Sequence, residues 1–234
     1  MRPTRPVASW LVVLLAAAPG GALAGVWDEL ASGQRRSVES GDAVMVEVPV
    51  AGVAWPKVTI YERIDSSPEE AAAVFADYGR HQVYIPNVLK SSITGQDGAT
   101  AEIDYVLDIR PHVFFLPSQS AYSVKDTVSS YDGGASFRVD WRMTRHDGTV
   151  EDTVGSARFE RFGTGTIMAY ENFVIPASRL AGLVKGRAMQ QVKDVAQAVA
   201  AQVAKERAGE SALLQTQRDA LRRALGTPPV PQVP

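Results

Sequence analysis

The sequence has no cysteine among its 234 residues. No disulfide can therefore hold the fold together, and the core must be stable through side-chain packing alone. The same absence excludes thiol nucleophiles, cysteine-ligated metal sites and attachment of a lipid to a cysteine.

Histidine is almost as scarce, with three in the chain: His81, His112 and His146. No two of them have the spacing of a zinc site, and the His-Glu-x-x-His pattern is missing. The Gly-x-Ser-x-Gly motif of serine hydrolases and a Gly-x-Gly-x-x-Gly motif after a strand are missing as well. We therefore expect neither a metal nor a cofactor.

The sequence has no large excess of charge of one sign, because it contains 24 Lys and Arg residues and 26 Asp and Glu residues. The formal net charge of -2 and the lack of basic runs interleaved with aromatics argue against a nucleic-acid partner. Hydrophobic residues make up 45% of the chain and charged residues 21%, which is typical of one globular domain with a sizeable core.

The N-terminus carries a targeting pattern. Arg2 and Arg5 precede an apolar run at 7–18, and the small residues at 22–24 fit a cleavage site. We predict a signal peptide over residues 1–24, and hence export, to the periplasm if the host is Gram-negative. An uncleaved anchor helix is the alternative. Beyond this segment no run is long and apolar enough to cross a membrane.

The next segments predict an arm, a strand and a helix. Residues 25–56 form an N-terminal arm with a short helix and a loosely alternating run that is either a strand or an edge arm. Residues 57–64 alternate clearly and predict a strand. A capping serine, Pro68 and an acidic pair predict the start of a helix, and Gly79 predicts its end.

Residues 88–175 have the pattern of six β-strands. Turns rich in Gly and Asp separate several of them, as at 97–98, 132–134 and 147–148. This spacing favours an antiparallel meander with short hairpins. The apolar residues of segment 110–119 are bounded by Pro111 and Pro117, so this segment is predicted to be a loop.

A long amphipathic helix is predicted after Pro176, because apolar residues recur every three or four positions. Residues 208–234 are expected to form a helical extension and a Pro-rich, disordered tail. An antiparallel sheet with one apolar face needs a cover, which the long helix supplies. We predict an α+β helix-grip fold: a curved antiparallel sheet of six to seven strands wrapped around a long C-terminal helix, with a short helical pair after the first strand. The apolar stripe of the long helix comprises Leu180, Val184, Ala188, Val192, Val195, Val199 and Val203.

Segment 58–93 resembles a known family. It has a strand ending in a small polar turn, a helix opened by a proline, Phe-Ala-Asp-Tyr at 75–78 and Tyr-Ile-Pro at 84–86. In these features the chain resembles the START-like (helix-grip, SRPBCC) superfamily, most of all its polyketide cyclase/dehydrase and coenzyme Q-binding branch. The resemblance covers about residues 43–203, places a ligand-binding domain at 57–207, and identifies a fold better than an activity. It implies a deep cavity for lipids, quinones, sterols or polyketides; some members are enzymes and many bind and carry.

The late strands separate charged residues from apolar ones. Arg138, Asp140 and Arg142 are expected to face water, which argues against catalysis by these charges, while their apolar neighbours face the helix. Such apolar residues form either a packed core or the wall of the implied cavity. The residues predicted to line it are Tyr84, Tyr105, Leu107, Phe115, Val139, Trp141, Met143, Met168, Tyr170 and Val184.

Two segments carry further candidates. Residues 75–87 are interpreted as a kinked helical pair rather than a catalytic set, with Tyr84 placed to reach the cavity and His81 a weaker candidate for ligand contact. Phe114 and Phe115 in the apolar loop predict a lid or a transient contact with a membrane surface. Folding of that loop back onto the core is the alternative.

Together these patterns favour an exported protein that binds, and carries, a hydrophobic small molecule such as a lipid, isoprenoid quinone or sterol. A non-catalytic role is favoured over an enzyme. Two alternatives stay open: a cyclase/aromatase-type enzyme that acts on a polyketide-like substrate in the same cavity, and a module that binds protein partners through its sheet or the helix at 213–225.

Overall fold

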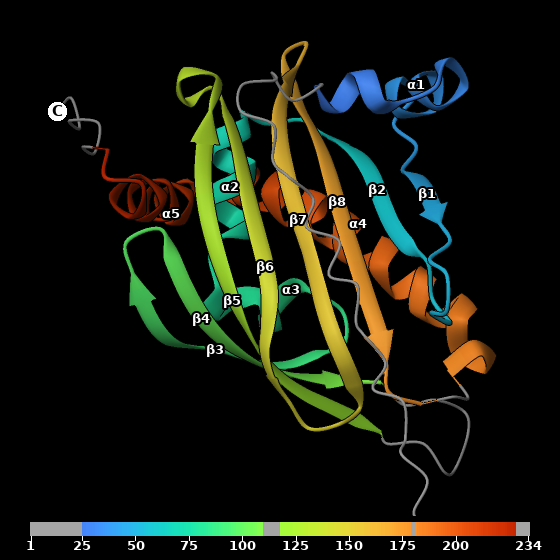
Figure 1. Ribbon diagram of the computed structural model, residues 1–234. Coiled ribbons are helices and arrows are strands. Elements are labelled where there is room, and N and C mark those ends of the chain that lie inside the picture. The colour runs from blue at the N-terminus through green and yellow to red at the C-terminus, as the bar shows by residue number, and fades with distance from the viewer. Residues whose placement is uncertain (1–24, 110–117, 179–180, 228–234) are drawn as a thin grey trace, which may run out of the picture.

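The computed structural model describes residues 25–109, 118–178 and 181–227. They form one antiparallel sheet in the order β1-β2-β8-β7-β6-β5-β4-β3 (Figure 1). The predicted number of six to seven strands was slightly too low, because the loosely alternating run in the N-terminal arm is a strand that pairs with β2. The eight strands are β1 (Val44–Val48), β2 (Lys57–Ile64), β3 (Val88–Asp97), β4 (Thr100–Asp108), β5 (Gln119–Tyr131), β6 (Ser136–His146), β7 (Val150–Phe162) and β8 (Gly165–Pro176).

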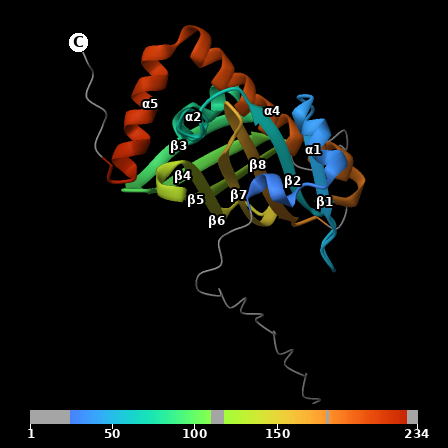
Figure 2. The same cartoon turned by 90° about the horizontal axis from the view of Figure 1, so that it is seen from above.

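Helices cover one face of this sheet, here called the inner face (Figure 2). The long helix α4 packs against it as predicted, with Val199 and Val203 of its apolar stripe fully buried. The short helical pair after β2 is also present, so the α+β helix-grip prediction is confirmed. The helices are η1 (Val26–Glu29), α1 (Ser32–Glu39), α2 (Pro68–Phe75), η2 (Tyr78–Arg80), α3 (His81–Tyr84), η3 (Asp132–Gly134), η4 (Ala181–Val184), α4 (Lys185–Gly209) and α5 (Ser211–Ala224).

Strand alternation decides which side chains reach the inner face. In β6, Phe137, Val139 and Trp141 are buried against the helices. Arg138 and Asp140 point to the other side and pair with each other, with 2.6 Å between the guanidinium Nη2 and the carboxylate Oδ1. Alternation along the strand therefore places the charged residues on one face of the sheet and the apolar residues on the other, as the sequence predicted.

Glycines make two of the predicted turns possible. Gly133 between β5 and β6 has φ of 66°, and Gly148 between β6 and β7 has φ of 95°. These left-handed conformations are costly for residues with a Cβ atom, so glycine fixes where each hairpin reverses.

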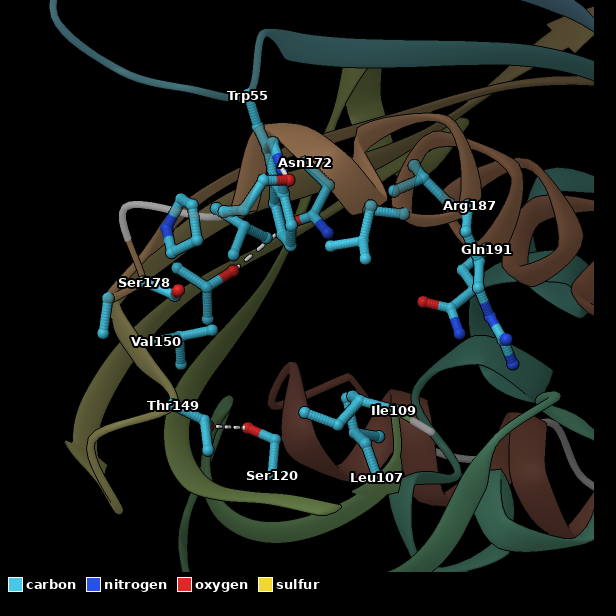
Figure 3. Close-up of a pocket in the computed structure, with 18 of the residues that line it drawn as sticks. Trp55, Leu107, Ile109, Ser120, Thr149, Val150, Asn172, Ser178, Arg187 and Gln191 are labelled. Carbon is cyan, nitrogen blue, oxygen red and sulfur yellow. Dashed lines mark hydrogen bonds between the residues drawn. The ribbon is translucent and has the colours of Figure 1, made fainter. Parts of the chain in front are cut away.

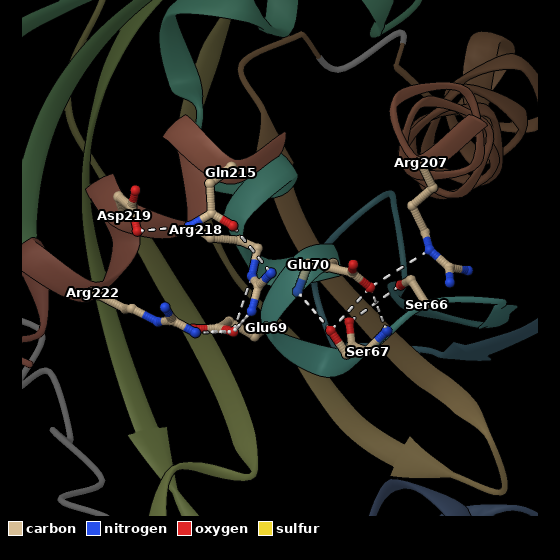
Figure 4. A network of polar contacts seen from close by, with 9 residues as sticks. All are labelled: Ser66, Ser67, Glu69, Glu70, Arg207, Gln215, Arg218, Asp219 and Arg222. Carbon is tan, nitrogen blue, oxygen red and sulfur yellow. Dashed lines mark hydrogen bonds and ion pairs between the residues drawn. The ribbon is translucent and has the colours of Figure 1, made fainter. Parts of the chain in front are cut away.

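Helix α2 begins with a capping box. The Ser67 hydroxyl accepts a hydrogen bond from the backbone N–H of Glu70, and the Glu70 carboxylate accepts one from the backbone N–H of Ser67 at 2.9 Å (Figure 4). Pro68 occupies the first turn, where its missing N–H costs nothing. These interactions fix the residue at which α2 begins.

Helix α5, in the C-terminal extension, docks back onto α2. The Glu69 carboxylate of α2 accepts hydrogen bonds from Arg218 at 2.8 Å and from Arg222 at 2.7 Å (Figure 4). Leu214 and Leu221 of α5 are buried in the main core. The extension is thus packed as part of the fold up to residue 227.

The N-terminal arm covers the opposite, outer face of the sheet. Val26 and Leu30 pack on Tyr61, Ile167 and Ala169, which alternate with inward-facing residues of β2 and β8. Two polar contacts fix this packing: the Val26 N–H donates to Glu160 at 2.7 Å, and Arg158 pairs with Glu29 at 2.6 Å. Near β2 and β8 the sheet therefore has an apolar core on each face.

Across the described ranges, no helix combines the length and the apolar composition needed to cross a membrane. The predicted signal peptide at 1–24, the loop with Phe114 and Phe115, and the end of the predicted tail from 228 lie outside the described residues.

Candidate ligand-binding cavity

The inner face of the sheet and α4 enclose a cavity of about 380 Å³ at the end of the molecule where η4 begins (Figure 3). Leu107 and Ile109 at the end of β4 form one wall, and Val150 and Asn172 of β7 and β8 contribute to the opposite side. Val184 of η4 also lines the space. This volume is within the range of about 300–1,000 Å³ that is usual for small-molecule sites.

A second cavity of about 160 Å³ continues from the first toward α2 and α3. Leu107, Tyr122, Asn172 and Val192 line both spaces, so they are the outer and inner parts of one cavity. Most of the lining is aromatic or aliphatic, which favours an apolar occupant.

The inner wall depends on the missing side chain of Gly155. A Cβ atom at this position of β7 would lie 2.4 Å from the Trp141 ring and 2.3 Å from the carbonyl oxygen of Glu171. Gly155 therefore lets the indole lie flat across β7, where it stacks on Tyr170 with 5.2 Å between ring centroids. This pair forms an aromatic wall of the inner cavity.

His81 lies at the inner cavity with both ring nitrogens engaged. Its Nε2 atom is 2.8 Å from the carbonyl oxygen of Phe75, and its Nδ1 atom is 2.7 Å from the Tyr105 hydroxyl. A carbonyl can only accept, so Nε2 carries the proton and Tyr105 donates to Nδ1. Burial lowers the pKa of His81 to about 4, partly offset by the bond to Phe75, so the ring is neutral near pH 7.

Asp126 of β5 is the acidic residue of the inner lining with the least solvent exposure, at 4%. Its Oδ1 atom is buried and has no hydrogen-bond partner among the described residues. Burial raises the pKa of this carboxyl group to about 8, so it is mostly protonated near pH 7. An unpaired polar group of this kind faces whatever fills the cavity.

Polar side chains also line the mouth of the cavity. Trp55, from the connection between β1 and β2, donates a hydrogen bond to the carbonyl oxygen of Ala181 at 2.9 Å, which joins that connection to η4. Arg187 and Gln191 of α4 line the opposite side, and Ser120 bonds to Thr149 at the base (Figure 3). Among the described lining residues, Arg187 is the one cation.

Nothing in the described residues resembles a metal centre, since no group of three or more His, Asp or Glu side chains is gathered at one point.

No family model matches the sequence, and no curated protein matches it either. Solved structures do. A STAR-related lipid transfer protein from Xanthomonas axonopodis superposes with a TM-score of 0.60 at 12% identity, over 69% of this chain and 93% of that one. Human StAR-related lipid transfer protein 5 gives 0.59 at 11% identity, over 70% and 83%. A START superfamily protein from Mycobacterium smegmatis gives 0.51 at 12% identity, over 64% and 97%.

The chain has a START-like, helix-grip fold. At these identities the likeness establishes the fold alone. The cavity described above lies between the sheet and the long helix that define this fold.

The START-like domain brings most of the predicted cavity residues to its inner face. Tyr105, Trp141 and Tyr170 line the inner cavity, Val184 lines the outer one, and Leu107 lines both. That any of them contacts a ligand stays a prediction.

The other predicted cavity residues lie elsewhere in the START-like domain. Val139 and Met168 are fully buried in the main core behind the cavity, and Met143 is partly exposed on β6, next to Val124 of β5. The Tyr84 hydroxyl donates to the carbonyl oxygen of Val74 at 3.1 Å, and its ring packs edge-on against His81. Phe115 lies outside the described residues.

Several lining residues of the domain were absent from the predicted cavity set, among them Asp126, His81 and Trp55. Asp126 was detectable, because it takes an inward position after Tyr122 and Val124 on an alternating strand. His81 was considered, but no sequence signal predicts the contact of this α3 residue with Tyr105 of β4. Trp55 lies in a connection without periodicity, so nothing local pointed to it.

Proposed function

We propose that the protein binds a hydrophobic small molecule, such as a lipid, isoprenoid quinone or sterol-like compound, in its START-like cavity and carries it. The observation that supports this most is the continuous apolar cavity between the sheet and α4, with its mouth at η4. The names of two similar structures, both lipid transfer proteins, support the same class of ligand.

Native purification followed by mass spectrometry of extracted lipid tests this proposal. Val192 lies on α4 and lines both parts of the cavity, so Val192→Trp should fill the space and reduce the recovered ligand at least tenfold. Ala201→Trp, on the exposed side of the same helix, is the matched control and should leave the yield of ligand unchanged. Equal ligand in both variants, or none in the wild type after supply of host lipid extract, would contradict the proposal.

Catalysis in the same cavity, as in a cyclase-type enzyme, is a second candidate function. It is favoured by one observation, the buried and unpaired Asp126 carboxyl group, since a neutral acid can polarise a carbonyl group. Recovery of the bound compound unchanged after prolonged incubation argues for a carrier. Conversion that Asp126→Asn abolishes argues for an enzyme.

The proposal places the protein outside the cytoplasm, on the strength of the N-terminal pattern at 1–24. N-terminal sequencing of the protein from the periplasmic fraction of a Gram-negative host should begin at Gly25. Protein that retains Met1 and stays in the cytoplasm would contradict export.

Transient contact with a membrane surface is part of the same proposal and rests on Phe114 and Phe115. Leu183 of η4, beside the mouth, is 72% exposed and adds apolar surface at this end of the molecule. Replacing both phenylalanines by Ser should reduce flotation with phosphatidylglycerol vesicles, while Met45→Ser, at an exposed site on β1, should not. Unchanged flotation of the double variant would refute membrane contact.

A further inference from the structure

Asp126 occupies a defined place at the end of the cavity. The strand register sets it between Ala101 of β4 and Trp141 of β6, in the row of β5 that includes Tyr122 and Val124. All of this row faces the helices, so the carboxyl group points to the inner space rather than to solvent.

The hydrogen bonding of Asp126 is incomplete, whereas two tyrosine hydroxyl groups of this region have partners. The Tyr105 hydroxyl donates to His81, and the Tyr84 hydroxyl donates to Val74. The Oδ1 atom of Asp126 has no such partner among the described residues. A buried polar group left unpaired is unfavourable, so an occupant that forms a hydrogen bond with it is preferred.

The surroundings of Asp126 supply no cation that could stabilise a carboxylate. Among the described residues, the inner lining has no Lys or Arg, and burial keeps His81 neutral by lowering its pKa to about 4. Asp108, at the end of β4, is the other carboxyl group of this lining. The remaining titratable groups facing this region are tyrosines, whose pKa values are all raised by burial. They are Tyr78, Tyr84, Tyr105, Tyr122 and Tyr170.

We propose that the Asp126 carboxyl group donates a hydrogen bond to an uncharged acceptor oxygen, such as that of a ketone, ester or quinone, at the inner end of a hydrophobic ligand. This inference rests on the proposed function and specifies the ligand further. A carboxylate or phosphate at the same place would be buried beside an acid without a cation, which is strongly unfavourable. The inner end therefore selects neutral carbonyl compounds over anionic lipids.

Two probes separate this inference from the proposed function. N-phenyl-1-naphthylamine, an uncharged fluorescent hydrophobe, reports the apolar cavity, and 2-decanone, which displaces it, reports recognition of a carbonyl group. Decanoate is the anionic counterpart. The variants are Asp126→Leu, which removes the donor, Asp126→Asn, which keeps one, and Lys125→Leu, an exposed neighbour on the same strand, as the control.

We expect Asp126→Leu to weaken displacement by 2-decanone about tenfold, the loss of one buried hydrogen bond. Binding of the fluorescent probe should stay within twofold, and Asp126→Asn and Lys125→Leu should resemble the wild type. Decanoate should displace the probe much less well than 2-decanone at pH 7. Equal 2-decanone affinity in wild type and Asp126→Leu, with the probe still bound, overturns this inference alone. Failure of the wild type to bind either probe overturns the proposed function and this inference with it.

Two measurements on the wild type apply even if Asp126→Leu does not fold. The carbonyl stretch of bound 2-decanone labelled with carbon-13 should lie at lower wavenumber than in hexane, and an unshifted band overturns the inference. Because burial raises the pKa of Asp126 to about 8, affinity for 2-decanone should also fall about tenfold from pH 7 to pH 9. The Asn variant should show no such fall.

Discussion

Both ring nitrogens of His81 are used inside the protein, and this makes the histidine a determinant of acid stability. Its pKa of about 4 in the fold, lowered by burial, lies below the ordinary value of 6.5. The unfolded chain therefore binds more protons between these values, and stability is lost as the pH falls from 6.5 toward 4. The protonated ring would also lose its ability to accept from Tyr105.

We predict that acidification from pH 7 to pH 4 lowers the free energy of unfolding by up to about 3 kcal/mol through this residue. His81→Gln keeps hydrogen-bonding capacity without titrating, so its stability should depend less steeply on pH over this range. Urea denaturation at several pH values measures the effect, with exposed His146→Gln as the control. Parallel pH profiles for wild type and His81→Gln would show that the buried ring does not control acid stability.

Gly155 is the second residue whose role is visible only in three dimensions. Since a Cβ atom would overlap both the Trp141 ring and the backbone of β8, Gly155→Ala must move the indole or separate two strands. Overpacking of this kind costs about 1–3 kcal/mol. We expect a lower melting temperature, altered tryptophan fluorescence and weaker binding of N-phenyl-1-naphthylamine.

Gly95→Ala in β3 is the matched control for Gly155→Ala. There the added Cβ atom would be no closer than 3.8 Å to any neighbour, an ordinary contact. A loss of stability that is the same in both variants would mean that glycine in a strand, rather than contact with Trp141, is responsible.

At the scale of elements, the sequence predicted those strands and helices whose position is determined by a local pattern of residues. The strands from β3 to β8 follow from alternation and from turns such as the one at Gly148, and α4 follows from its apolar stripe. β1 was ambiguous because an edge strand is half-exposed and alternates weakly. The docking of α5 depends on contacts between Glu69 and arginines about 150 residues away, which no local pattern reveals.

The contact between α2 and α5 yields an element-scale prediction. Glu69→Gln removes the charge that Arg218 and Arg222 share, and charge-assisted bonds are stronger than neutral ones. These side chains are partly exposed, so we expect a loss of about 1 kcal/mol and faster amide hydrogen exchange in α5, with α4 less affected. Glu102→Gln, an exposed site on β4, serves as the control. Unchanged exchange in α5 would show that its apolar contacts alone hold it.

At the scale of the whole molecule, the sheet has a core on each face, and the two cores differ. The outer one, under the N-terminal arm, is a small cluster that includes Val26 and Val38, both fully buried. The inner one leaves about 380 Å³ open at the mouth of the cavity. Periodicity predicted which side chains face inward, but not which of them pack in the core and which line the cavity. Met168 is packed and Tyr170 lines a cavity, although both share one face of β8.

An open cavity in an otherwise packed core makes stability depend on its occupant. A ligand that binds the folded state alone, at one hundred times its dissociation constant, adds about 2.7 kcal/mol. For a chain of this size that corresponds to a rise of about 5–10 °C in melting temperature. Protein stripped of lipid by organic extraction and refolding should melt lower by about this amount and recover when the extracted lipid is returned. The Val192→Trp variant, whose cavity is filled, should show neither change, and an identical response in that variant would place the lipid outside the cavity.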